Sequence, residues 1–166
     1  MVDGVGLPMT SSQGGDGGHE PAGAGASAPT GGWTLARARR AVQVASAGAR
    51  RHGLAVVVAV VDAGGTLATM DRMDGAPLLS VDLAVDKAWT AVAFGIPTDQ
   101  WWPLLRDDPA LAAGLPHRPR LVIFGGGVPL RVGGQLVGGI GVSGGTADED
   151  AALARAGATA FEVAET

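Results

Sequence analysis

Glycine falls into two groups along the chain, and this distribution limits the fold more than any other feature. Ten of the 28 glycines lie in the first 32 residues, among alanine, proline and serine. Such a segment has too few apolar residues to offset the entropy of folding, so residues 1–32 are predicted to form a disordered leader. The other glycines punctuate a chain rich in alanine, valine and leucine, which predicts a single domain over residues 33–166.

The composition excludes several classes of protein. Cysteine and tyrosine are absent, which rules out disulfide scaffolds, thiolate metal sites and cysteine nucleophiles. The formal charge is −4 and the arginines form no long run, which argues against a nucleic-acid partner. The longest strongly apolar stretch, Leu54 to Val61, is too short to span a bilayer, and the N-terminus lacks a secretory signal pattern. We therefore expect a cytoplasmic protein with no membrane partner.

The first part of the chain predicts two long helices separated by a hairpin. Apolar residues recur every three or four positions from Thr34 to His52, which indicates an amphipathic helix. The valine-rich run Leu54 to Val61 is typical of a central strand, and Thr66 to Met73 alternates as its hairpin partner. The segment Leu78 to Phe94 is apolar almost all round, so this second helix is expected to be buried on more than one side.

The second part predicts a meander of strands and a terminal helix. Thr98 to Arg106 is expected to form a short helix, and Asp107 to Pro119 is expected to be irregular. A capping-box sequence at Thr146 starts a helix that runs to about Val163. Between the irregular segment and this terminal helix, glycine clusters separate three expected strands: Leu121 to Phe124, Val128 to Val132 and Gln135 to Val142. Hairpins rather than repeated βαβ units predict a mixed α/β (α+β) fold with about five antiparallel strands flanked by helices.

Several motifs together resemble a known family. They are Val61-Asp-Ala-Gly-Gly-Thr-Leu, Arg72-Met-Asp-Gly-Ala76, Lys87-Ala-Trp-Thr-Ala91, Gly126-Gly-Val-Pro-Leu130 and Val137-Gly-Gly-Ile-Gly-Val-Ser-Gly-Gly145. In this order they resemble the GlcG/HbpS family of heme-binding-like proteins, to which the C-terminal domain of PduO-type proteins belongs. The resemblance covers residues 33 to about 163. It implies a profilin-like sandwich with a five-stranded antiparallel sheet, assembly into homo-oligomers, and binding of heme or a corrinoid.

A heme or corrinoid centre needs an axial ligand, and His52 and His117 are the candidates outside the leader. His52 ends the first helix, where its attraction to the helix dipole is an explanation without a ligand. His117 lies in an arginine-containing loop, so His117 and Arg118 are predicted to contact a cofactor, with a solvated loop as the alternative. The backbone N–H groups of Gly126 and Gly127 are further candidates for binding an anionic ligand, whereas tight turns also explain these glycines.

A second group of residues suggests acid–base chemistry. Lys87 is the only lysine and lies among apolar residues, so burial is expected to lower its pKa toward the range of a catalytic base. Asp62 and Arg72 are the predicted catalytic partners, and Asp74 shares a strand face with Arg72. The alternatives are an aspartate that caps its own turn at Asp62, and a structural salt bridge from Lys87 to Asp62 or Asp74.

Two main functional hypotheses follow from these residues. The first is an oligomeric small-molecule-binding protein that holds heme or a corrinoid. The second is a cofactor-independent enzyme of the isomerase, cyclase or lyase type that uses the same pocket. The residues leave the choice open between heme, a corrinoid and no cofactor, and a purely structural assembly protein is a third hypothesis that leaves the isolated lysine unexplained.

Overall fold

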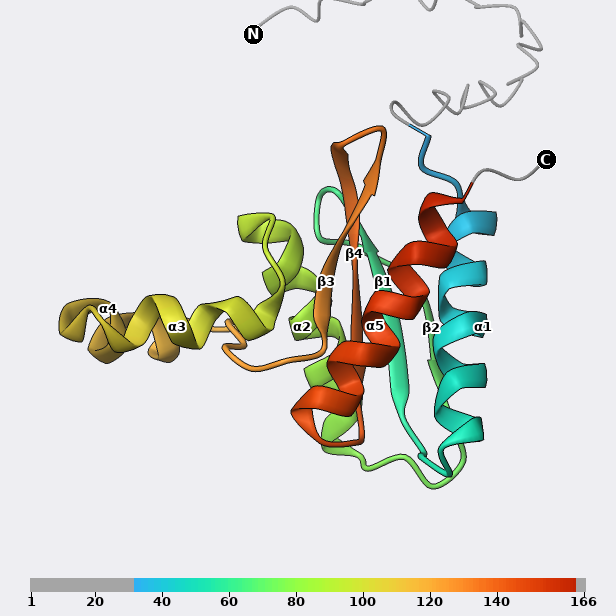
Figure 1. Cartoon of the computed structure of the whole chain (residues 1–166), viewed down its shortest axis with the longest axis horizontal. Coiled ribbons are helices and arrows are strands. Elements are labelled where there is room, and N and C mark those ends of the chain that lie inside the picture. Colours follow the sequence, from blue (N-terminus) through green and yellow to red (C-terminus); the bar gives the residue numbers. More distant parts are fainter. Residues whose placement is uncertain (1–31, 164–166) are drawn as a thin grey trace, which may run out of the picture.

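Helices cover both faces of a four-stranded antiparallel sheet (Figure 1). The computed structural model describes residues 32–163, so the expected leader lies outside the described residues except for Gly32. No helix within that range is long and apolar enough to cross a membrane. The elements are α1 (Leu35–Arg51), β1 (Val57–Asp62), β2 (Leu67–Arg72), α2 (Leu79–Phe94), η1 (Thr98–Gln100), α3 (Trp101–Arg106), α4 (Pro109–Gly114), η2 (Leu115–His117), β3 (Gly127–Val132), β4 (Gln135–Ser143) and α5 (Ala147–Glu162).

The sheet has the strand order β2-β1-β4-β3, with β2 and β3 at its edges. All three strand pairs are antiparallel, and β1 lies between β2 and β4. The first five residues of β1 are buried because this strand is covered on both faces. Helices α1 and α5 pack on one face of the sheet, and α2 packs on the other (Figure 1). The mixed α/β class and the antiparallel sheet flanked by helices are therefore confirmed.

The expectation of five strands is wrong, because the described part of the chain has four. The segment Leu121 to Phe124 does not join the sheet. The backbone N–H of Val122 instead donates to the hydroxyl of Thr90 on α2, at 3.1 Å, and the same hydroxyl donates to the carbonyl of Arg120, at 2.8 Å. This fully buried threonine supplies the hydrogen bonds that a neighbouring strand would otherwise provide.

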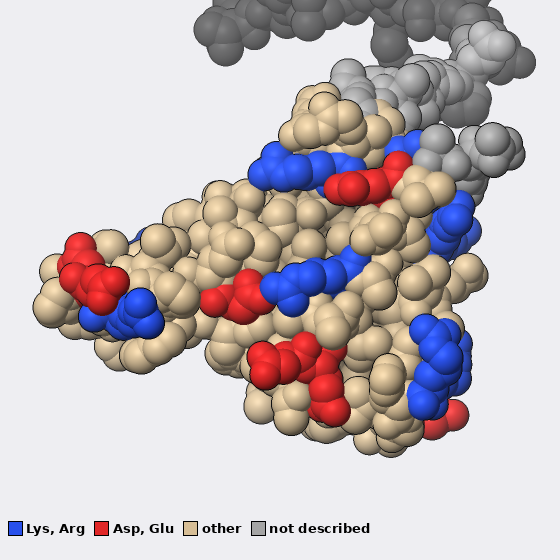
Figure 2. Space-filling view, in the orientation of Figure 1, with Lys and Arg blue, Asp and Glu red and all other residues tan. Residues whose placement is uncertain are grey.

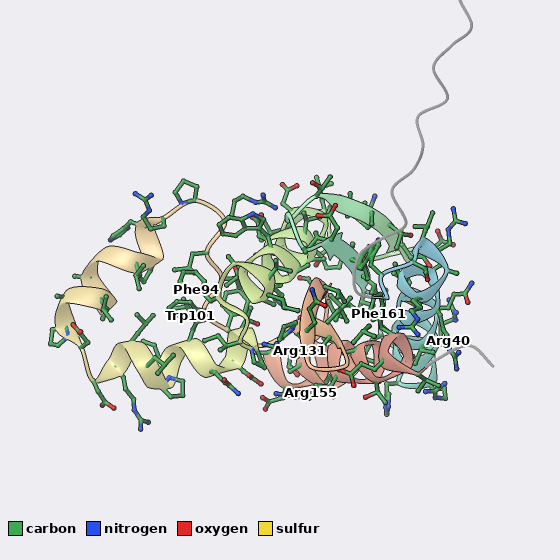
Figure 3. All side chains as sticks on the ribbon, turned by 90° about the horizontal axis from the view of Figure 1, so that it is seen from above. Arg40, Phe94, Trp101, Arg131, Arg155 and Phe161 are labelled. Carbon is green, nitrogen blue, oxygen red and sulfur yellow. The ribbon has the colours of Figure 1, made fainter. Side chains whose placement is uncertain are left out.

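The segment Asp107 to Pro119, expected to be irregular, contains α4 and η2. Asp108 caps α4 by accepting from the backbone N–H groups of Ala110 and Leu111, both at 3.0 Å, and Pro109 follows at the first helical position. Together with α3 these elements form an arm that projects from the end of α2 (Figure 1). At its base Phe94 and Trp101 meet edge to face, with ring centroids 4.5 Å apart (Figure 3).

Candidate functional site

Lys87 lies at the centre of a buried polar cluster, and only 1% of its side chain is exposed. Its Nζ donates to Oδ2 of Asp150 at 2.7 Å and to the carbonyl oxygen of Val142 at 2.9 Å. The same Nζ lies 5.1 Å from the centroid of the Phe124 ring, a cation–π contact. We call these four residues the Lys87 centre. Its ammonium has a carboxylate, a carbonyl and an aromatic face as partners.

The electrostatics of the Lys87 centre combine burial with pairing. Burial lowers the pKa of Lys87 below its ordinary value of 10.5, while the hydrogen bond and the charge of Asp150 offset part of this effect. The other carboxylate oxygen of Asp150 accepts from the backbone N–H of Gly145 at 2.9 Å. The ion pair thus ties α2 to β4 and to the start of α5. A structural partner was expected at Asp62 or Asp74, but the structure places Asp150 there.

Asp150 lies in the acidic first turn of α5 and was not among the partners expected for Lys87. The partner was missed because α5 reaches α2 through a contact between residues 63 positions apart in the sequence. A usable signal was present, since three consecutive residues of a helix point in three different directions and one of these acidic residues is therefore the nearest to the packed face. Asp148 and Glu149 are exposed, whereas Asp150 is buried.

Gly126 and Gly127 lie directly against the Lys87 centre and are buried. A Cβ atom on Gly126 would lie 2.7 Å from Nζ of Lys87, and one on Gly127 would lie 2.3 Å from the Lys87 carbonyl oxygen. The backbone N–H of Gly127 donates to the hydroxyl of Thr98 at 2.8 Å. Close packing therefore explains why these positions are glycine, and their contact with a cofactor stays a prediction.

Asp62 lies away from the Lys87 centre. Its Oδ1 accepts from two backbone N–H groups of its own turn, both at 2.9 Å, as the turn-capping alternative expects. In the sheet, Asp62 is paired with Gly138, four residues along β4 from Val142, which separates the two backbone positions by roughly 13 Å. The structure thus does not bring Asp62 and Lys87 together.

Arg72 lines an open cleft at the edge of the sheet, between β2 and the last turns of α1. Its Nη2 donates to the carbonyl oxygen of Ala76 at 3.0 Å. Within residues 32–163 it makes no salt bridge with Asp74, although both line the cleft. We call this cleft of about 490 Å³ the edge cleft; its lining residues are Ser46, Arg50, Met70, Asp71, Arg72, Met73 and Asp74.

Ser46 is the one lining residue whose polar group is both buried and unsatisfied. The side chain lies on the sheet-facing side of α1 and is 1% exposed. Its hydroxyl oxygen has no hydrogen-bond partner among the described residues. Sequence reasoning passed over Ser46, although a serine next to the apolar position Ala45 on an amphipathic helix was a visible signal.

His117 and Arg118 lie at the end of the arm, in and directly after η2. Both side chains are exposed. Arg120, two residues further on, ties the arm back to α2: its Nε donates to Oδ1 of Asp86 at 2.9 Å, and its guanidinium lies 4.8 Å from the Trp89 ring centroid. Basic side chains form small separate groups on the face shown in Figure 2.

His52 borders a second cleft, at the junction of α1 and α5. It is the C-cap residue of α1, as the helix-dipole alternative expects. Hydrogen bonds from the backbone and hydroxyl of Thr146 lower the pKa of Glu149, and the charge of His52 adds to this effect. We call this cleft of about 300 Å³ the His52 cleft; its lining residues are His52, Leu54, Asp148, Glu149, Ala152 and Leu153.

Comparison with known proteins identifies close relatives over most of the chain. A family model described as "Haem degrading protein HbpS-like" matches residues 33–159. The "Uncharacterized 15.0 kDa protein in dhaT-dhaS intergenic region" of Citrobacter freundii is 37% identical over 129 residues, which cover 77% of this chain and 91% of that protein. The corrinoid adenosyltransferase PduO of Salmonella typhimurium is 40% identical over 109 residues, which cover 65% of this chain but only 32% of PduO.

Among solved structures, one described as a PduOC:heme complex superimposes with a TM-score of 0.70. It is 34% identical in sequence, and the match covers 77% of this chain and 94% of the other.

Proposed function

The chain belongs to the HbpS-like family, and from this premise we propose that it binds a heme-type tetrapyrrole in the His52 cleft. One observation carries the proposal: an imidazole borders an open cleft whose other wall residues include Leu54, Ala152 and Leu153. Imidazole is a common axial ligand of heme iron, and aliphatic side chains suit the faces of a porphyrin. The similarity to a PduOC:heme complex supports heme as the ligand.

The residues of the His52 cleft fit such a group in two respects, and its two acidic residues restrict how the group is oriented. The imidazole of His52 is exposed and therefore accessible to iron. The aliphatic wall excludes water from one side of the ligand. Asp148 and Glu149 repel the carboxylates of the ligand, so the propionates are expected to point away from the start of α5. Bound heme would supply a redox-active iron, whereas the protein supplies the ligand, the apolar wall and the orientation.

A cleft of about 300 Å³ accommodates only part of a tetrapyrrole, so the rest of the ligand needs other cover. We infer that a second copy of the chain associates with the first, as the resemblance implies. Exposed apolar side chains on α2 and the arm support this inference, among them Leu78, Leu79 and Trp102, which are 78%, 69% and 58% exposed. Sedimentation velocity tests it: the wild type should sediment as an oligomer and the variant Leu78→Lys/Leu79→Lys as a smaller species. A monomeric wild type would contradict it.

Titration with hemin, followed by the Soret band, tests the ligand assignment. The wild type should show a saturable shift of the band. His52→Ala should lower the affinity by at least about tenfold, because the iron loses its axial ligand. His117→Ala is the matched control, since His117 is an exposed histidine on the arm, and it should retain the wild-type affinity. A His52→Ala variant with the wild-type spectrum and affinity would overturn the proposal.

A corrinoid is the second ligand that the comparisons support, because PduO is named a corrinoid adenosyltransferase. The chain spans only a third of PduO, so this ligand is tested directly with a cobalamin in the same titration. Saturable binding of the cobalamin without a response to hemin would replace heme by a corrinoid in the proposal.

The alternative of a cofactor-independent isomerase, cyclase or lyase stays a prediction. The structure separates its three predicted residues: Lys87 is paired with Asp150, Asp62 caps its own turn, and Arg72 lines the edge cleft. No contact within the described residues joins any two of these three side chains.

A further inference from the structure

We propose that the edge cleft binds a free α-amino acid with an uncharged side chain, at a site separate from the one proposed for heme. The cleft of about 490 Å³ lies between α1 and β2, where β2 is an edge strand of the sheet. Met70 packs with residues on the α2 side of the sheet, whereas Met73 packs with the cluster on the α1 side. The two methionines of the cleft therefore pack toward opposite faces of the sheet at its edge.

The charges of the edge cleft are balanced and unpaired. Arg50 and Arg72 contribute two guanidinium groups, and Asp71 and Asp74 contribute two carboxylates. None of the four takes part in a salt bridge within residues 32–163. Arg72 uses one N–H on the carbonyl of Ala76, which fixes the guanidinium and leaves its other donors for a ligand.

A ligand with both charges fits this arrangement better than a simple ion. An anion is attracted by the two arginines but repelled by the neighbouring aspartates. A cation is attracted by the aspartates but repelled by the arginines. A zwitterion places its carboxylate against a guanidinium and its ammonium against a carboxylate, and so satisfies both kinds of group. In an α-amino acid the two charges are separated by a single carbon atom, so both fit within one cleft.

Ser46 gives independent support for a polar ligand. A buried hydroxyl without a partner costs free energy, and such groups in native proteins call for an explanation. Ser46 is buried, lacks a partner among the described residues and lines the edge cleft. A ligand carboxylate or ammonium at this wall would provide the missing hydrogen bond.

The remaining lining residues indicate the side chain of the amino acid. Met70 and Met73 are flexible, polarisable and partly buried, so they adapt to apolar groups of different shapes. The lining carries two positive and two negative charges, so a zwitterion without net charge keeps the cleft neutral, whereas a charged ligand side chain would leave a net charge in it. An aliphatic or other uncharged side chain is therefore expected.

Thermal unfolding of the full chain in the presence of each standard L-amino acid tests the proposal. At least one amino acid with an uncharged side chain should raise the Tm and bind saturably in calorimetry. Its methyl ester, which lacks the carboxylate charge, and its N-acetyl derivative, which lacks the ammonium, should each bind about tenfold more weakly. No saturable binding by any amino acid, or equal binding of these derivatives, would overturn the proposal.

Variants separate a ligand site from a structural feature. Arg72→Gln and Asp74→Asn should each weaken binding about tenfold, whereas the control Arg51→Gln, an exposed arginine outside the cleft, should not change it. Ser46→Ala should weaken binding but raise the Tm of the free protein, because it removes an unsatisfied hydroxyl. His52→Ala should leave amino-acid binding intact, which keeps this test independent of the heme proposal. A Ser46→Ala variant with a lowered Tm, or equal losses in Arg51→Gln and Arg72→Gln, would contradict the assignment.

Discussion

The Lys87 centre and the edge cleft both contain positively and negatively charged side chains, but in the described part of the chain only those of the Lys87 centre form a salt bridge. In the Lys87 centre, the ammonium contacts Asp150, Val142 and Phe124, and the aspartate also accepts from Gly145. In the edge cleft, two arginines and two aspartates have no salt-bridge partner within the described chain. A buried titratable residue is thus not by itself a sign of chemistry. In the edge cleft the charged side chains are exposed, and the buried hydroxyl of Ser46 is the group that lacks a partner among the described residues.

The largest expected effect comes from breaking the ion pair of the Lys87 centre. Lys87→Met leaves Asp150 buried without its cation, so the free energy of unfolding should fall by about 3–5 kcal/mol. Urea denaturation measures this change. The double variant Lys87→Met/Asp150→Leu removes both charges and should recover most of the loss, because two apolar side chains replace the pair. If Lys87→Met has the same free energy of unfolding as the wild type, Lys87 does not have the structural role proposed for it.

A second prediction tests the close packing around the same centre. Gly127→Ala places a Cβ atom 2.3 Å from the Lys87 carbonyl oxygen, which should cost about 1–3 kcal/mol of unfolding free energy. Gly114→Ala is the matched control, since nothing lies within 4 Å of its Cβ position. Comparison of the two urea midpoints measures the difference. Equal midpoints would show that the centre has more room than the structure indicates.

A third prediction extends the comparison to the link between α2 and the arm. Arg120 has a positive φ of 69°, which costs free energy for any residue except glycine. Arg120→Gly and Arg120→Ala both lose the contacts with Asp86 and Trp89, so their difference isolates the backbone conformation. The glycine variant should be the more stable of the two by about 1 kcal/mol in thermal or urea unfolding. If the alanine variant is the more stable, the left-handed conformation at Arg120 is contradicted.

The smallest expected effect concerns Glu149, in the wall of the His52 cleft. Hydrogen bonds from Thr146 lower the pKa of Glu149 from its ordinary value of 4.5, so the folded state holds this carboxylate deprotonated more readily than the unfolded chain. Its contribution to stability is complete above pH 4.5 and is lost as the pH falls through the lower, folded value. Glu149→Gln should therefore be slightly less stable than the wild type at neutral pH, and the difference should shrink in acid. Urea unfolding at neutral and at acidic pH measures the stability difference between the wild type and Glu149→Gln, with the exposed Glu162→Gln as the control. A difference that is as large in acid as at neutral pH would contradict the assignment of this stability to the Glu149 carboxylate.

Much of the fold follows from the sequence because local patterns determine it. The spacing of apolar residues located α1 within a few residues, a segment apolar almost all round located α2, and a capping-box sequence located the start of α5. Valine-rich or alternating runs located β1 and β2. The segment Leu121 to Phe124 has a suitable composition for a strand but forms none, and its Val122 N–H donates to the hydroxyl of Thr90 rather than to a neighbouring strand. A contact between residues about 30 positions apart leaves no local pattern.

The candidate sites were less predictable, because they depend on how distant elements meet. The burial of Lys87 followed from its apolar neighbours, but its pairing with Asp150 depends on where α5 enters the structure. The edge cleft joins the last turns of α1 to β2, so Ser46 and Arg50 came together with Arg72 only in the folded chain. His52 was identified as a candidate ligand, whereas the cleft that it borders could not be predicted.

The central claim is that the Lys87 centre stabilises the fold, whereas ligands bind at the end of α1. The hemin affinity of two variants tests this claim most directly. The variants are Lys87→Met/Asp150→Leu, which removes the buried pair while keeping apolar packing, and His52→Ala, which removes the proposed axial ligand. The account predicts that the double variant binds hemin with an affinity close to that of the wild type, while His52→Ala loses at least about tenfold. Loss of hemin binding in a folded double variant, with wild-type binding in His52→Ala, would contradict it.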